Sequence, residues 1–201
     1  MMPPLQAALA ADTQAAVEDR VLAFWFGTED DPLRHVFRPW WMNANTAIDA
    51  TMIALFTGIT GDAAAGRLES LIETPRGALA LVLLLDQFPR NLWRGHAKSF
   101  AADAKARAVA TEILRRGYDK GYSEVERLFC AMPFEHSEDI VDQERALSLI
   151  VRLNNQDWYL HAMHHYTIIA RFGRFPHRNV ALKRKSTPAE EAFLTEPWSR
   201  F

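Results

Sequence analysis

The segment from residue 78 to residue 85 is apolar at every position, and it constrains the fold more than any other stretch of the chain. Thr74 and Pro75 precede it, as an N-cap followed by proline at the first helical position. A surface helix would carry polar residues along one face, whereas a helix that is apolar all round must be covered on every side. We therefore expect a central helix surrounded by other helices.

The rest of the chain has the same helical character. Apolar residues recur at spacings of three and four, and sustained period-two alternation is missing. We predict an all-α fold of antiparallel helix pairs around a buried polar site. At 201 residues the chain suits one domain, covering residues 1–201, with residues 1–12 as a flexible tail.

Capping signals predict where the helices begin and end. The first should begin at Asp12 or Thr13, and Pro89 should end or kink the central one. Ser137 should cap the helix that follows it, which is a more frequent role than a nucleophile beside His136. Helices are predicted over residues 13–26, 45–58, 75–88, 103–116, 123–131, 138–153 and 157–172, with a last one opened by the capping box of Thr187 and Glu190.

Composition excludes several classes of protein. Lysine and arginine number 23 against 25 acidic residues, so no global field drives binding to nucleic acid or to an anionic membrane. The first residues lack the basic and apolar regions of a signal peptide, and no apolar run approaches the roughly 20 residues of a membrane span. Cys130 is the single cysteine, lies in an apolar context, and is predicted to be a core residue in a cytoplasmic protein.

Three polar motifs are expected to meet at one site. They read DQFPRN at 86–91, FEHSE at 134–138 and RFGRFPHRN at 171–179. Asp86 follows the buried helix directly, and a buried carboxylate must be paired, since an unpaired one costs several kcal/mol. Arg90 and Arg94, one and two turns later, are its nearest candidate partners. The basic run at 183–185 is instead expected to be a solvated loop.

Arginine recognises carboxylate and phosphate groups, so this site suits a small anionic ligand. If the site is also catalytic, with hydrolase-like chemistry, His136 would move a proton, Asp86 or Glu138 would orient its ring, and arginines would hold the anion. The predicted ligand-binding residues are Arg90, Asn91, His165, Arg171, Arg174, His177, Arg178 and Asn179. The same arginines could instead be neutralised by Asp86, Glu138 and Asp142 in a purely structural network; the histidines, which such a network does not need, favour a ligand.

The longest predicted helix carries a spacing that metal sites use. His161 and His165 are four residues apart, a spacing that can chelate zinc. The sequence shows no clear third ligand, so neither a metal nor a cofactor is predicted.

Four motifs resemble a known family. VLAFWFG at 21–27, LDQFPRN at 85–91, PFEHSE at 133–138 and residues 165–179 are similar to the bacterial family called "domain of unknown function 924", over residues 17–194. The resemblance implies a tetratricopeptide-like helical architecture and no assigned activity. It implies a His-Ser-Glu pattern at 136–138, which places less weight on Glu135. Lys183 departs from the family, because a glycine is expected before the arginine there.

The implied architecture adds a second class of function. Arrays of helix pairs present concave grooves to peptides and partner proteins. A groove lined by arginine would favour acidic peptides, so an interaction module is the alternative to a small-molecule site.

Overall fold

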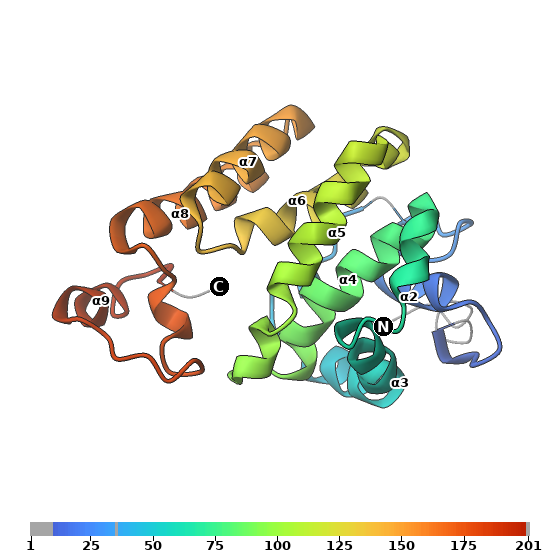
Figure 1. Cartoon of the computed structure of the whole chain (residues 1–201), viewed down its shortest axis with the longest axis horizontal. Coiled ribbons are helices and arrows are strands. Elements are labelled where there is room, and N and C mark those ends of the chain that lie inside the picture. Colours follow the sequence, from blue (N-terminus) through green and yellow to red (C-terminus); the bar gives the residue numbers. More distant parts are fainter. Residues whose placement is uncertain (1–9, 35, 200–201) are drawn as a thin grey trace.

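In the computed structural model, residues 10–34 and 36–199 are described, and within them the chain folds into helices with no strand (Figure 1). The prediction of an all-α fold is confirmed. Of the predicted tail, residues 1–9 lie outside the described residues; Ala10 is buried, and its carbonyl accepts a hydrogen bond from Nε of Arg20 at 3.1 Å. No described helix combines the length and the apolar character needed to cross a membrane.

The central helix is α4 (Pro75–Leu92), as the apolar run predicts. The Thr74 hydroxyl caps it by accepting a hydrogen bond from the backbone of Gly77 at 3.1 Å. Four helices cover it: α2 (Val17–Trp25), α3 (Thr46–Ala64), α5 (Asp103–Arg116) and α6 (Glu124–Glu135). Burial of α4 on every side explains why its sequence is apolar all round.

Aromatic side chains fill the space between α4 and its neighbours. Trp25 packs edge-on against Phe129, with ring centroids 5.5 Å apart, and Phe56 meets Phe88 at 5.1 Å. Trp41, in a 3-10 turn at Pro39–Trp41, is buried against Phe129 as well. Cys130 is buried in the same core, as predicted.

The C-terminal part forms a second group of helices. Here α7 (Ile140–Ile150) and α8 (Gln156–Phe172) pack side by side, and α9 (Pro188–Phe193) follows. Figure 1 shows α6 between this group and α5, and α6 contacts α4, α5, α7 and α8. The ends of α4 and α6 therefore bring the first two polar motifs together. The tetratricopeptide-like arrangement stays a prediction.

Some predicted boundaries are wrong because packing extends helices past residues that disfavour them. α3 continues through Gly58 to Ala64, since Thr60 and Ala63 extend its buried stripe and outweigh a cost of about 1 kcal/mol per glycine. α4 continues past Pro89 to Leu92, and α6 passes Pro133 to reach Glu135.

Two helix starts also differ from prediction. α2 begins at Val17, four or five residues after the expected cap. Asp139, not Ser137, caps α7 by accepting a hydrogen bond from the backbone of Val141 at 2.9 Å. The Ser137 hydroxyl instead accepts from the backbone of Asp139 at 3.2 Å, so it shapes the turn that leads into the helix.

Candidate functional site

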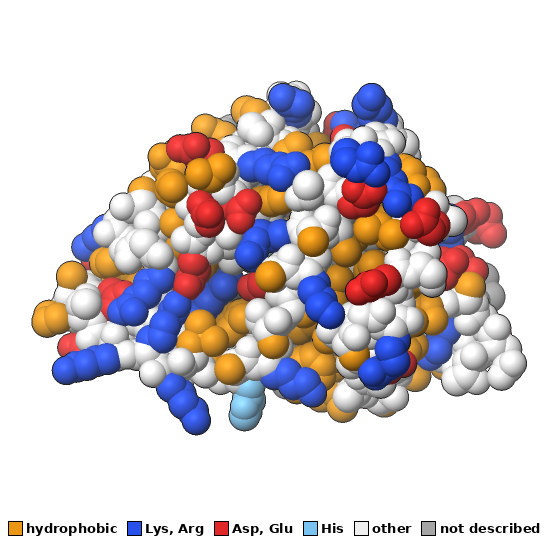
Figure 2. All heavy atoms as spheres, viewed as in Figure 1, with side chains coloured by type: hydrophobic (Ala, Val, Ile, Leu, Met, Phe, Trp, Pro, Cys, Tyr) orange, Lys and Arg blue, Asp and Glu red, His pale blue; other side chains and the backbone are white. Residues whose placement is uncertain are grey.

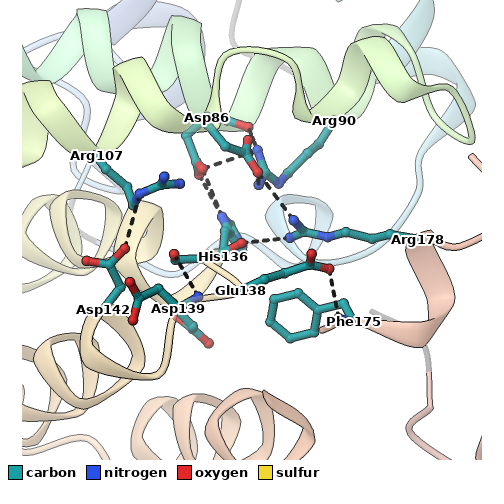
Figure 3. Close-up of polar contacts among 12 residues, drawn as sticks. Asp86, Arg90, Arg107, His136, Glu138, Asp139, Asp142, Phe175 and Arg178 are labelled. Atoms are coloured by element: carbon teal, nitrogen blue, oxygen red, sulfur yellow. Dashed lines mark hydrogen bonds and ion pairs between the residues drawn. The ribbon is translucent and has the colours of Figure 1, made fainter. Parts of the chain in front are cut away.

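Asp86 and His136 form a buried pair at the ends of two helices. Asp86 lies in the penultimate turn of α4 and is fully buried, and His136 is the C-cap residue directly after α6. Nδ1 of His136 lies 2.9 Å from both carboxylate oxygens of Asp86 (Figure 3). Because an ionised carboxylate can only accept, Nδ1 is the protonated nitrogen, and Nε2 carries the lone pair.

The surroundings keep Asp86 ionised. Burial alone would raise the pKa of this carboxyl, but the charge of Arg90, 3.1 Å away, and the contact with His136 outweigh burial and hold the pKa well below its usual range. Gln87 donates a further hydrogen bond at 2.6 Å. Arg94, the other predicted partner, binds Asp49 at 2.9 Å instead.

His136 is kept neutral. Burial lowers the pKa of its imidazole, Arg90 lowers it further, and the charge of Asp86 opposes both. A neutral ring whose Nδ1 donates to a carboxylate can accept a proton at Nε2, which is what a general base requires. The contact between Asp86 and His136 is the arrangement from which a proton-transfer role can be argued.

Arg178 connects the third motif to this pair. It is 5% exposed, and its guanidinium lies between the rings of Phe100 and Phe175, at 4.5 and 4.6 Å. Nη2 donates to the backbone carbonyl of His136 at 3.0 Å, and Nη1 lies 3.3 Å from Asp103. Burial lowers the pKa of Arg178 to about 10, so the side chain remains a cation at neutral pH.

Asp103, at the start of α5, also binds Arg90 at 3.1 Å. Burial raises the pKa of Asp103, against the opposing charge of Arg90. Two guanidinium groups thus share this carboxylate. Sequence reasoning missed Asp103 as a site residue, because it precedes Arg178 by 75 positions and lies outside the three motifs.

A pocket of about 870 Å³ opens beside this network. His136 and Arg178 line it, together with Arg107 of α5, which pairs with Asp142 at 3.1 Å. Figure 2 shows basic and acidic side chains intermixed over the face of the molecule that it views. The remaining lining residues are Phe100, Asp103, Ser137, Glu138, Asp139, Ile140, Ile169, Ala170, Gly173 and Leu182.

Glu138 lies at the same pocket but belongs to a different set of contacts. Its carboxylate accepts from the backbone of Phe175 at 2.8 Å and from both terminal nitrogens of Arg184, at 2.6 and 2.9 Å. Arg184 stands in the basic run that was expected to be solvated, and it is instead partly buried in this ion pair. Glu138 thus anchors the C-terminal loop and does not contact His136 through a hydrogen bond in the described structure.

Other predicted residues have contacts with partners outside the pair. Arg174 binds Glu190 at 2.6 and 2.8 Å, and Asn179 accepts from Arg184 at 3.0 Å. Arg171 is exposed and lies over the Phe172 ring. Asn91 donates to Asp49 at 2.9 Å, on the side of α3.

His165 and His177 are not among the residues that line the pocket. The ring of His177 lies 5.6 Å from Phe175. His165 is buried on α8 with its ring 6.1 Å from that of His136. Its Nδ1 donates to the backbone carbonyl of His161 at 2.9 Å and lies 3.1 Å from Glu135. Burial, together with the charge of Asp86, raises the pKa of Glu135 to about 8.

The fold and the site define an all-α protein in which a buried carboxylate–histidine pair adjoins an open pocket. Comparison with known families confirms the resemblance: the chain belongs to the family described as bacterial protein of unknown function (DUF924), whose model matches residues 21–198. No curated protein matches the chain.

One solved structure is similar over almost its whole length. It is that of a protein of unknown function, ATU0120, from Agrobacterium tumefaciens, with 40% sequence identity and a TM-score of 0.78. The match covers 94% of this chain and 98% of that chain.

Proposed function

We propose that the protein is an enzyme whose pocket binds a small anionic ligand, with His136 as a general base oriented by Asp86. The observation that carries this proposal is the contact of Nδ1 of His136 with both oxygens of Asp86 at 2.9 Å, in a residue that lines the pocket. A carboxylate on Nδ1 selects the tautomer and the ring orientation in which Nε2 accepts a proton.

Arg178 is the proposed anion-binding group. It lines the pocket, stays cationic at neutral pH, and shares the carboxylate of Asp103 with Arg90. Its Nε is buried and has no hydrogen-bond partner among the described residues. A cation whose counter-ion is shared is suited to a carboxylate or phosphate group, and Arg107 brings a second guanidinium to the pocket wall.

Hydrolysis is the reaction class that fits these parts. His136 would take a proton from water as the water oxygen forms a bond to the carbonyl carbon or phosphorus of the substrate. The bond from that atom to the leaving group would break, and His136 would return the proton to the leaving group. Arg178 would hold the anionic group and stabilise negative charge that develops during the attack. A positioned base of this kind contributes about 100-fold to 10,000-fold to a rate.

The test is a thermal-shift screen against phosphorylated and carboxylated metabolites, followed by turnover assays on any hit. A ligand at about one hundred times its dissociation constant stabilises the folded protein by about 2.7 kcal/mol. Arg178→Gln should abolish the shift, whereas His136→Gln should keep the shift and lose turnover. Arg152→Gln, the same change at an exposed position outside the pocket, should alter neither.

Each alternative gives a different result. If acidic peptides stabilise the protein and small molecules do not, the chain is an interaction module. If neither class of compound stabilises it, and both variants only lower the melting temperature, the charged cluster is a structural network.

A further inference from the structure

A group of side chains that can bind a metal lies close to the Asp86–His136 pair and outside the pocket lining. It consists of Glu135, at the end of α6, with His161 and His165 of α8. One ligand atom from each of the three residues lies within 4.8 Å of the other two. The fold thus supplies the third ligand that the pair of histidines lacked in the sequence.

The type and placement of these groups suit a transition metal. Two histidines one helical turn apart and a carboxylate from another helix form the His₂Glu set of catalytic zinc sites, which leaves a coordination position for water or substrate. Nδ1 of His165 donates to the backbone carbonyl of His161 at 2.9 Å. The same nitrogen lies 3.1 Å from Glu135, so the ring faces the carboxyl group, and a metal ion bound through this nitrogen would displace its proton.

The burial of Glu135 is a second, independent observation. Its side chain is 5% exposed, and no arginine or lysine within the described part of the chain forms an ion pair with it. Asp86, Asp103 and Glu138 differ from Glu135, since each of them binds an arginine. A bound metal ion would give this buried carboxyl, once ionised, a cationic partner.

The separations are close to those of a zinc site. Two ligand atoms each about 2.1 Å from a zinc ion are at most about 4.2 Å apart, and the three ligand atoms lie within 4.8 Å of one another, so any movement needed to bind the ion is small. His161 is exposed, so its side chain can rotate toward the ion, while Glu135 and His165 are buried. The exposed side also provides a route for the ion to enter.

We propose that Glu135, His161 and His165 bind a zinc ion, with a fourth position open to solvent beside His161. This site does not depend on the proposed function, because none of the three residues lines the pocket that holds the proposed base.

The experiment uses the untagged full chain after treatment with a chelator. Zinc chloride is titrated by calorimetry, and bound metal is counted by mass spectrometry after dialysis. We expect one zinc per chain and a zinc-dependent rise in melting temperature, which needs no activity assay. His161→Ala and Glu135→Gln should weaken binding by at least about 100-fold, more than the loss of an outer-shell partner usually costs.

His164→Ala is the matched control. It removes the histidine adjacent to His165 on the same helix, whose Nε2 bonds the carbonyl of Trp198, and it should leave zinc affinity unchanged. His161 is exposed, so His161→Ala should fold and can be compared directly with the control. The proposal is overturned if the unaltered chain binds no zinc, or if both alanine variants bind zinc equally.

Discussion

Nη2 of Arg178 donates a hydrogen bond of 3.0 Å to the backbone carbonyl of His136, across 42 positions of sequence. This bond joins the segment after α8 to the end of α6, where the proposed base lies. The C-terminal segment is therefore part of the site. Loss of this arginine should lower the free energy of unfolding of the protein.

We predict that Arg178→Met lowers the free energy of unfolding by about 3 kcal/mol, because the change removes one partner of a buried ion pair. Arg171→Met is the matched control seven residues earlier. That side chain is exposed and lies over Phe172, so its loss should cost less than about 1 kcal/mol. Urea denaturation measures both variants, and equal losses would show that Arg178 has no special structural role.

Asp86→Asn should lower the pKa of His136 further, because the Asp86 charge is the main effect that opposes burial and Arg90. Titration of the histidine ring signals by NMR measures this pKa directly. Asp142→Asn is the control, since Asp142 pairs with Arg107 on a partly exposed surface and should leave the His136 titration close to that of the unaltered chain. A pKa of His136 that rises in Asp86→Asn would contradict the stabilisation of the protonated ring by the Asp86 charge.

Substitution by alanine should change the stability of the protein in opposite directions at two helical glycines. A Cβ added at Gly58 meets nothing within 4 Å, so Gly58→Ala should stabilise α3 by up to about 1 kcal/mol. A Cβ at Gly77 would collide with the backbone oxygen of Leu71, so Gly77→Ala should cost about 1–3 kcal/mol. The melting temperatures of the two variants test both predictions. Shifts in the same direction would contradict the difference in steric surroundings of the two glycines.

Lys183→Gly should stabilise the protein. Lys183 has a φ of 53°, in the left-handed region where an ordinary residue costs about 1–2 kcal/mol more than glycine. The greater freedom of glycine in the unfolded chain offsets part of this gain, which leaves about 0.5–1 kcal/mol. Lys185→Gly, two residues later and without a positive φ, should destabilise slightly; thermal unfolding compares the two.

Glu190 should contribute to stability in a pH-dependent manner. Arg174 lowers the pKa of this carboxyl from 4.5 to about 2 in the folded protein. Its contribution is thus complete above pH 4.5 and is lost as the pH falls toward 2. Denaturant curves of the unaltered chain and Glu190→Gln should differ most near pH 7 and converge in acid; a constant difference would contradict the pKa.

Local signals in the sequence were enough to predict the class and many helix boundaries. The hydroxyl of Thr74 caps α4, Gly117 ends α5 with a φ of 70°, and Ser123 and Thr187 form their capping boxes with Glu126 and Glu190. Each of these interactions joins residues within one turn, so the sequence alone contains both partners. The predictions that Asp86, Arg90, His136 and Arg178 meet were also correct, because charged residues next to apolar runs must find partners when the runs are buried.

Only the tertiary structure decided which partners those are. Asp103 binds Arg178 across 75 positions, and Arg184 binds Glu138 across 46, contacts that leave no periodic trace in the sequence. Packing also carried α3 past Gly58 and α4 past Pro89, where local preference favours a helix end. Residue type and spacing specify helices and the need for charge pairing, whereas the choice of partners depends on how the helices pack in three dimensions.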